Sequence, residues 1–339
     1  MIERLSLLDQ SVDSLEGWLT EAGEPAYRSR QILKWVDQLQ PIDSMSDLPA
    51  PLRELLKEKF TDEYIDTSEC IESEDEGTNR FLFRLKDGEA VESVQIGAPE
   101  DYTACISTQV GCGLRCSFCA SGKFGLVRNL SPGEIVGQIL SLRKVISQRH
   151  GVDGWPRHIV YMGMGEPFQN YQATMDSIRR LIDPQGINFG VRRITVSTVG
   201  LVPEIYRFAE EDLQVGLAVS LHAPNSDLRK SIMPIEEVYP LSRLFPACEK
   251  YIEKTGRRLT FEYILLKDIN DGPKEAKKLV EIFKSWKLVH FNLIRYNPIG
   301  LTRLRPPSPP QAKAFLHRLR EGGLHVTLRQ SPGKKINAA

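Results

Sequence analysis

The sequence predicts an α/β protein with a mostly parallel sheet, preceded by a small N-terminal α/β module. From about Asp101 onward, seven apolar β-type runs alternate with amphipathic helical patterns, which is typical of parallel strands joined by crossover helices. Residues 1–95 show a different order, with helical runs first and a hairpin after them. The chain has 339 residues, which is enough for one large folding unit and a small one.

The N-terminal module is predicted to contain three helices and one hairpin. A strongly acidic stretch at residues 62–76 separates the helices from the hairpin. The dipeptide Asp87-Gly88 is a typical hairpin turn signal between two alternating runs. The helical runs cover residues 15–19, 27–36 and 51–60, and the hairpin strands cover residues 80–85 and 90–95.

The larger module is predicted from its seven strands. Helical patterns lie between the strands, and the best marked begins at Ser131, where Pro132 and Glu134 complete a capping-box signature. This alternation allows either an open doubly wound sheet or part of a TIM-like barrel. The predicted strands cover residues 103–110, 158–162, 193–197, 215–221, 259–266, 291–296 and 325–329.

Composition excludes several classes of protein. No run approaches the roughly 20 apolar residues of a membrane helix, and the first residues lack a secretory signal pattern. We therefore expect a cytoplasmic protein with no membrane partner. The formal net charge is zero, yet residues 301–339 carry eight Lys or Arg and one acid. That stretch is either a phosphate-binding surface or a solvated helix face.

Three cysteines form the strongest local motif. Cys112, Cys116 and Cys119 have the spacing C-x3-C-x2-C in a loop just after the first strand of the larger module. Thiolates hold iron–sulfur clusters, usually four to a cluster, so three ligands leave one iron open. A structural zinc site is the alternative, but zinc prefers four ligands, and the sequence has no second cysteine pair or histidine nearby. The motif therefore predicts a 4Fe-4S cluster.

The same motif, with Phe118 before its last cysteine, resembles the signature of radical S-adenosylmethionine (SAM) enzymes. Further segments, in the same order, resemble the RlmN/Cfr family of RNA adenosine methyltransferases. The resemblance implies a radical SAM partial (βα)6-type TIM-like barrel at residues 96–330, with an RNA-contacting accessory domain at residues 1–95. The resembling segments are residues 27–32, 105–112, 125–130, 162–167, 192–198, 220–225, 233–235 and 292–298.

The resemblance also implies the cofactors and the residues that bind them. SAM is expected to chelate the open iron and to be cleaved to a 5′-deoxyadenosyl radical, with Glu166 pairing with its ammonium group. From the residues alone, Glu166 could equally be an acid at a helix N-terminus, and His222 a buried histidine. The expected SAM contacts are Gly165, Glu166, Ser197, Ser220, Leu221, His222 and Asn297.

Two further residues receive catalytic roles from the resemblance. Glu92 matches the proton acceptor of the family, and Cys105 matches the cysteine that releases the product through a transient disulfide. Without the resemblance, Glu92 would be a solvent-facing hairpin carboxylate and Cys105 a small buried residue.

The family places a methyl-carrying cysteine directly after the segment that resembles residues 331–339. The sequence stops at Ala339, and we expect that it is truncated just before that cysteine. Cys70 and Cys248 lie outside the family motifs and are interpreted as core residues.

Within the family, the segments at Glu166-Pro167 and at residues 222–225 resemble the branch that methylates adenine C2. Residues 295–298 instead resemble the branch that methylates C8, which confers antibiotic resistance. The C2 branch implies adenosines of 23S rRNA at the peptidyl-transferase centre and of tRNA next to the anticodon. We expect a monomer with an electron donor such as flavodoxin. The residues expected to contact phosphate are Tyr27, Arg28, Arg30, Lys34, Trp35 and the basic C-terminal stretch.

Two alternatives remain. One is another radical SAM reaction on a non-RNA substrate, although such enzymes often need cysteines for a second cluster. The other is a non-catalytic RNA-binding homologue that keeps the cluster as a structural element.

Overall fold

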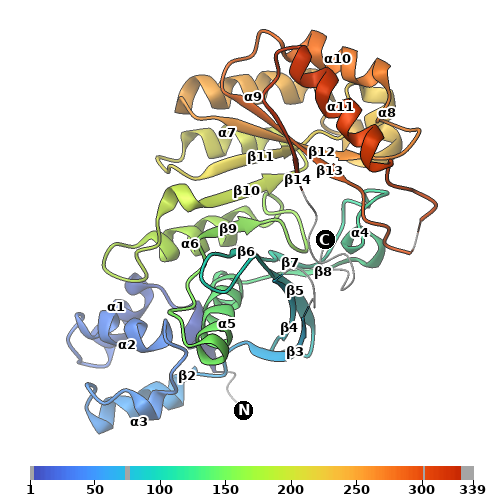
Figure 1. Ribbon diagram of the computed structural model, residues 1–339. Helices are drawn as coiled ribbons and strands as arrows, with labels where there is room; N and C mark the ends of the chain where they lie inside the picture. The colour runs from blue at the N-terminus through green and yellow to red at the C-terminus, as the bar shows by residue number, and fades with distance from the viewer. Residues whose placement is uncertain (1–3, 73–76, 301, 330–339) are drawn as a thin grey trace.

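The computed structural model describes residues 4–72, 77–300 and 302–329. Three helices form its N-terminal part (Figure 1). Their apolar faces contribute Leu15, Ile32 and Leu52, all fully buried, to the main hydrophobic core. These helices are α1 (Val12–Glu21), α2 (Arg28–Val36) and α3 (Ala50–Lys59), and the short strands β1 (Leu5–Ser6) and β2 (Phe60–Thr61) pair in parallel. The three helical runs predicted from the sequence are confirmed.

A ten-stranded sheet forms the centre of the molecule, in the order β14-β13-β12-β11-β10-β9-β6-β5-β4-β3. The seven strands from β14 to β6 are parallel to one another, whereas β5, β4 and β3 are antiparallel. All seven predicted strands of the larger module therefore lie in one parallel sheet. The strands are β3 (Asp66–Glu72), β4 (Thr78–Arg84), β5 (Ala90–Ile96), β6 (Thr103–Cys105), β9 (His158–Tyr161), β10 (Ile194–Thr198), β11 (Gly216–Ser220), β12 (Leu259–Leu265), β13 (Val289–Arg295) and β14 (Val326–Arg329).

The helices show that this sheet is part of a barrel. The parallel strands lie side by side in the sheet in the same order in which they follow one another along the chain. Right-handed crossovers between them therefore place all of the connecting helices on one face of the sheet. Figure 1 shows α6, α7, α9, α10 and α11 on the outer side of the sheet. An open doubly wound sheet, with helices on both faces, is excluded. The helices are α4 (Ser121–Phe124), α5 (Pro132–His150), α6 (Tyr171–Ile182), α7 (Val202–Glu210), α8 (Ser226–Ile232), α9 (Leu241–Thr255), α10 (Pro273–Phe283) and α11 (Pro309–Glu321).

The N-terminal hairpin extends the barrel sheet. β4 pairs with β5 as predicted, and β5 pairs directly with β6 of the parallel part. The predicted domain boundary after residue 95 therefore falls inside one continuous sheet. Part of the acidic segment forms β3, which was not predicted as a strand because it lacks an apolar pattern. β3 lies at the edge of the sheet, where charged residues are common.

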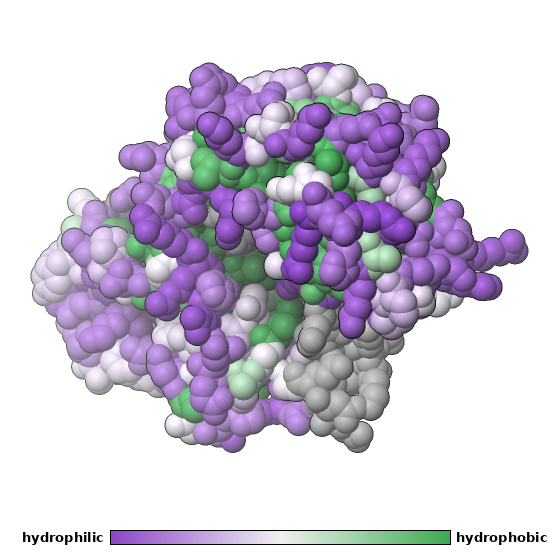
Figure 2. Space-filling view, turned by 45° about the horizontal axis from the view of Figure 1, so that its top comes forward, coloured by the Kyte–Doolittle hydropathy of each residue, from purple (hydrophilic) through white to green (hydrophobic). Residues whose placement is uncertain are grey.

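The two faces of the sheet differ in the residues that they carry. On β12, Phe261 packs against Phe283 of α10, and Tyr263 packs against Phe315 of α11. Side chains alternate along a strand, so Glu262 belongs to the opposite face. We call this opposite face, which no crossover helix covers, the concave face. Figure 2 shows a hollow with an apolar floor and a hydrophilic rim.

A separate hairpin leaves the barrel next to β6. The sequence predicted one strand over residues 103–110, but the structure has β6 and then β7 (Gln109–Cys112), which pairs with β8 (Gly125–Asn129). The chain leaves the sheet at Ser107, because the backbone N–H and carbonyl of this residue bond to the side chain of Gln138 instead of to a neighbouring strand. Gln138 Oε1 accepts the Ser107 N–H at 2.9 Å, and its Nε2 donates to the Ser107 carbonyl at 2.9 Å.

None of the helices in the described part of the chain combines the length and the apolar character that are needed to cross a membrane.

Candidate active site

The three motif cysteines lie on the loop between β7 and β8. Cys112 ends β7, and Cys116 and Cys119 follow before α4. Cys112 and Cys116 are buried and Cys119 is partly buried, all within one apolar cluster that includes Ile232. The Ser117 N–H donates to the Ile232 carbonyl at 2.9 Å and so fixes the loop to the end of α8.

The chemistry of these thiols fits an iron–sulfur cluster. Burial, with a smaller contribution from a charge on Cys119, raises the pKa of Cys112 to about 11 and that of Cys116 to about 12. Three thiolates so close together, two of them buried, would therefore repel one another unless a cationic group neutralised them. In the described residues, no three His, Cys, Asp or Glu side chains are yet gathered around one point.

The loop after β9 contacts the start of the β7–β8 hairpin. Gly165 adopts a φ of +101°, and a Cβ there would lie 2.6 Å from the Cβ of Gln109 on β7. The same Gln109 accepts the Glu166 N–H at 2.8 Å. Only glycine allows this close approach of the two segments.

Glu166 is buried and connects two strand ends. Its Oε1 accepts the Phe168 N–H at 3.1 Å, and its Oε2 accepts the Val199 N–H at 2.9 Å. Burial raises the pKa of Glu166 to about 7, although these N–H groups and the Thr198 hydroxyl oppose the rise. The predicted SAM contact is thus also a structural link between the β9 and β10 loops.

Ser197, Ser220 and His222 lie at or just beyond the carboxyl ends of β10 and β11, as predicted. Asn297 lies two residues beyond β13 and is partly buried. Leu221 is fully buried in the main core, so its side chain is not part of the concave face. Parallel strands end at one edge of the sheet, and ligands bind at this edge in such folds.

His222 has a fixed tautomer and a fixed position. Its φ is +57°, and its Nδ1 accepts the Ile264 N–H at 3.0 Å, so the proton of the neutral ring is on Nε2. Burial, with the nearby positive charge of Arg229, lowers the pKa of His222 to about 3. Its ring packs edge-on against Phe118 at 4.8 Å between centroids, which connects the strand end to the cluster loop.

Two buried polar residues near the site had no distinguishing signal in the sequence. Arg229 donates to the Ser220 carbonyl at 3.1 Å and to the Leu221 carbonyl at 3.2 Å, and it pairs with Glu236 at 2.6 Å. Asn270 donates to the His222 carbonyl at 2.8 Å. Both residues stand in ordinary helical or turn contexts, so their roles emerge only in three dimensions.

Glu92 and Cys105 lie on the same face of neighbouring strands. Cys105 is opposite Val94 in the β5–β6 register, and Glu92 is two residues from Val94 on β5. Glu92 forms an ion pair with Arg80 at 3.2 Å. Burial raises the pKa of the Cys105 thiol to about 11, whereas the charge of Arg329 opposes this rise.

All six cysteines are free. The transient disulfide predicted for Cys105 is therefore not formed in this structure. Cys248 is fully buried in α9, and Cys70 is partly buried against the same core, so the interpretation of both as core residues agrees with their positions.

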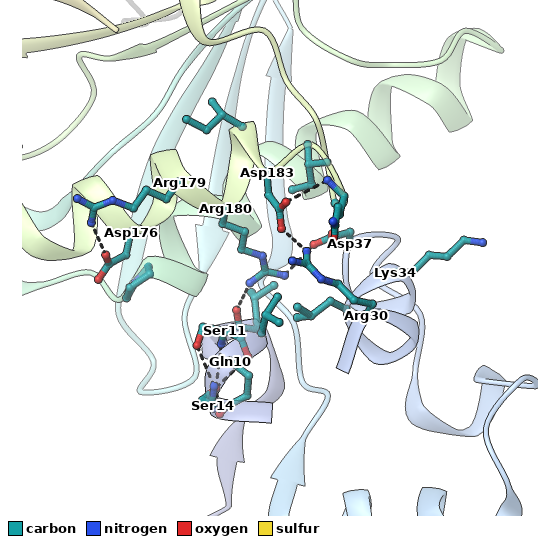
Figure 3. Close-up of a pocket in the computed structure, with 18 of the residues that line it drawn as sticks. Gln10, Ser11, Ser14, Arg30, Lys34, Asp37, Asp176, Arg179, Arg180 and Asp183 are labelled. Atoms are coloured by element: carbon teal, nitrogen blue, oxygen red, sulfur yellow. Dashed lines mark hydrogen bonds and ion pairs between the residues drawn. The ribbon is translucent and has the colours of Figure 1, made fainter. Parts of the chain in front are cut away.

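A cavity of about 1480 Å³ lies between the N-terminal helices and α6. Its lining includes Arg30 and Lys34, which were predicted to contact phosphate, and none of the residues predicted to be catalytic or to bind the cluster or SAM. Figure 3 shows Arg30 reaching Asp183 and Arg180 reaching Asp37 beside it. Arg28 also forms an ion pair, with Glu24 at 2.9 Å. Arg28 and Arg30, predicted to contact phosphate, are thus engaged within the protein. The predicted segment at residues 331–339 lies outside the described residues.

Comparison with known proteins agrees with this architecture. Residues 106–280 match the family model of the radical SAM superfamily, and residues 5–61 match that of the ribosomal RNA large subunit methyltransferase N-terminal domain. The chain is 41% identical to a probable dual-specificity RNA methyltransferase RlmN of Natranaerobius thermophilus, over 98% of this chain and 95% of that protein. A relative of the same name from Thermotoga neapolitana is 44% identical over 98% and 96%.

A solved structure also superposes closely. The crystal structure of a radical SAM methyltransferase from Sphaerobacter thermophilus has a TM-score of 0.92 and 44% identity, covering 99% of this chain and 98% of that one. The chain belongs to the RlmN family of radical SAM methyltransferases, which are enzymes that use a 4Fe-4S cluster and SAM.

Proposed function

We propose that this chain methylates C2 of adenosine, in 23S rRNA at the peptidyl-transferase centre and in tRNA next to the anticodon. Two curated relatives carry the name of dual-specificity RNA methyltransferases. The N-terminal residues also match a ribosomal RNA methyltransferase domain. The Glu166-Pro167 segment, which resembles the C2 branch, supports this choice of ring carbon.

The observation that carries the proposal is the position of Glu92 relative to Cys105. Their strands are adjacent and the two side chains share the concave face, displaced diagonally by two residues. Diagonal neighbours of this kind have Cβ atoms within about 8 Å. A carboxylate and a thiol can therefore act on one adenine ring placed between them.

In this proposal Cys112, Cys116 and Cys119 would hold the cluster and leave one iron for SAM. A bound cluster would supply the electron for the reductive cleavage of SAM. The residues proposed to hold SAM are Gly165, Glu166, Ser197, Ser220, Leu221, His222 and Asn297, which come from the ends of four strands. The neutral His222 and the buried Glu166 fix the loops that surround it.

Glu92 and Cys105 would act on a covalent RNA–protein adduct, in which the carbon of the family's methyl-carrying cysteine is bonded to C2 of the adenine. Radical addition leaves this adduct with one unpaired electron, which the oxidised cluster would take back before the adduct is resolved. Glu92 accepts the proton that leaves C2 of the adenine. The Cys105 thiolate attacks the sulfur of the adduct, so a sulfur–sulfur bond forms and the sulfur–carbon bond breaks. The electron pair of the broken bond stays on the product carbon, which takes up a proton and becomes the methyl group. The charge of Arg329 favours the Cys105 thiolate against its burial.

The adenine must leave its stack to reach Glu92 and Cys105, as other base-modifying enzymes require. Arg329 is exposed at the end of β14 and is proposed to contact the RNA backbone. The proposal includes a monomeric enzyme in the cytoplasm and an electron donor such as flavodoxin.

The test is mass spectrometry of rRNA and tRNA nucleosides after reaction with the full-length protein. We expect 2-methyladenosine, whereas 8-methyladenosine would assign the chain to the antibiotic-resistance branch. If neither methyladenosine forms while SAM is still cleaved, the chain is a non-catalytic RNA-binding homologue or acts on a different substrate.

Two variants test the roles of the side chains. Glu92→Gln should still produce 5′-deoxyadenosine while product falls at least about 100-fold, the usual contribution of a general base. Cys105→Ala should instead accumulate the RNA–protein adduct, visible by gel electrophoresis. Glu89→Gln, at an exposed acid in the β4–β5 turn, is the matched control and should match the wild type. Normal product from Glu92→Gln would refute the assigned role.

A further inference from the structure

Glu262 presents a carboxylate to the concave face that the family motifs do not account for. The residue is 4% exposed and lies in the middle of β12. Its neighbours Phe261 and Tyr263 point outward to α10 and α11. The alternation of the strand therefore directs Glu262 to the side where SAM is proposed to bind.

One of its two carboxylate oxygens lacks a partner. Asn292 Nδ2 donates to Glu262 Oε1 at 3.0 Å. Glu262 Oε2 is buried and receives no hydrogen bond from any described residue. Burial raises the pKa of Glu262, and the contact with Asn292 and the charge of Arg329 oppose that rise. Buried carboxylate oxygens rarely remain without a donor, so this atom is suited to a ligand that carries one.

The position of Glu262 in the sheet relates it to the proposed SAM contacts. It stands in register with Ser220 on β11 and Asn292 on β13. Its carbonyl accepts the Leu221 N–H at 3.0 Å. The unpartnered oxygen therefore lies in the same row as Ser220, at the carboxyl end of the barrel.

The donors of SAM are its ammonium group, its adenine amino group and its ribose hydroxyls. The ammonium is proposed to lie near Glu166, which follows β9 and is three strands away from β12, or about 14 Å at normal strand spacing. Glu262 therefore faces the adenosyl part. Carboxylates are the usual acceptors for ribose hydroxyls in nucleotide-binding α/β folds.

We propose that Oε2 of Glu262 accepts a hydrogen bond from a ribose hydroxyl of bound SAM. The inference rests on the proposed SAM site, and it does not depend on which adenine carbon is methylated.

The test measures the Kd of SAM and of its 2′-deoxy and 3′-deoxy analogues with cluster-reconstituted protein and no RNA. The wild type should bind one of the two analogues about tenfold more weakly than SAM, which is the effect of one hydrogen bond. Glu262→Gln should bind SAM about tenfold more weakly and should no longer distinguish it from that analogue. Because no RNA is present, a wrong assignment of the methylated carbon would leave this result unchanged.

Thr260→Val is the matched control, since Thr260 lies on the same face of β12 one row further from the carboxyl ends. It should retain the wild-type preference, and iron content should be equal in all three proteins. Equal binding of SAM and both analogues by the wild type would overturn the inference, whether or not the variant folds. The same holds if Glu262→Gln keeps the preference, or if it weakens SAM and both analogues equally. If Glu262→Gln leaves SAM binding unchanged, the inference is overturned, and weaker RNA binding by this variant in a separate titration would assign the donor to the target nucleotide.

Discussion

Arg229 shows how one side chain organises the end of a parallel strand. Arg229 donates to the carbonyls of Ser220, the last residue of β11, and of Leu221, which follows it. Glu236 balances its charge from the buried side. A guanidinium has five donors and can satisfy several carbonyls at once. This contact stabilises the turn in which His222 adopts its left-handed conformation.

His222 should make the stability of the protein depend on pH. In an unfolded chain histidine has a pKa near 6.5, whereas burial lowers the pKa of His222 to about 3 in the folded state. Between these values the unfolded chain binds one more proton. Its contribution to stability is therefore complete above pH 6.5 and is lost as the pH falls below that value.

His222→Asn tests this dependence, because asparagine tolerates a positive φ and can still accept the Ile264 N–H. Acidification from pH 7 to pH 5 should lower the free energy of unfolding of the wild type by about 2 kcal/mol more than that of the variant. Urea denaturation at the two pH values measures the difference. Equal losses in the two proteins would show that His222 does not titrate in this way.

The grouping of the three motif cysteines, and the position of the polar residues at the strand ends, could be predicted from the sequence. The spacing of the cysteines and the order of the strands along the chain are enough for these predictions. Cys112, Cys116 and Cys119 are neighbours in the chain, so no fold is needed to group them. The contacts of Arg229 and the proposed SAM contact of Glu262 could not be predicted from the sequence. The importance of these two residues depends on which strand face they occupy and on partners from distant segments.

At the scale of elements, the β7–β8 hairpin positions the loop that carries Cys112, Cys116 and Cys119. Gly111 has a φ of +76°, and a Cβ at this position would lie 1.9 Å from the Gly125 carbonyl oxygen. Gly113 is two residues away without a positive φ, and a Cβ there would lie 3.6 Å from the Leu126 side chain, an ordinary contact. The two glycines therefore form a matched pair.

Gly111→Ala should lower the free energy of unfolding by about 3 kcal/mol or more, since backbone strain and overpacking add. It should also reduce the iron bound per chain after reconstitution, because the hairpin must shift. Gly113→Ala should resemble the wild type in both urea denaturation and iron content. Full iron loading of Gly111→Ala would mean that the cluster loop does not depend on the hairpin geometry.

The same scale shows why some elements could be predicted and others not. The strands of the barrel are continuous apolar runs, because parallel strands are buried on both faces, and all seven were found. The break between β6 and β7 was missed because it depends on Gln138, which comes from α5. A hydropathy pattern cannot show that the side chain of a residue far along the chain will replace a hydrogen bond between two strands.

At the scale of the whole molecule, the connections that join the N-terminal part to the barrel include two of different kinds. The first is the sheet itself, through the pairing of β5 with β6. The second is the ion-pair network beside the cavity in Figure 3, where Arg180 of α6 pairs with Asp37 at 2.8 Å and also donates to the Leu8 carbonyl. Burial raises the pKa of Asp37 more than Arg180 lowers it, so the pair is costly to desolvate.

That cost leads to a prediction about removing one partner or both. The side chains of Arg180 and Asp37 are 15% and 16% exposed, whereas that of the adjacent Arg179 is 47% exposed. Arg180→Met leaves Asp37 as an unpaired buried charge and should lower the free energy of unfolding by about 2–3 kcal/mol. Arg179→Met, the control, should cost less than about 1 kcal/mol, as exposed pairs do. Adding Asp37→Leu to Arg180→Met removes the unpaired charge, so the double variant should recover part of the loss in urea denaturation. A double variant less stable than Arg180→Met alone would show that the network stabilises the junction through packing instead of charge.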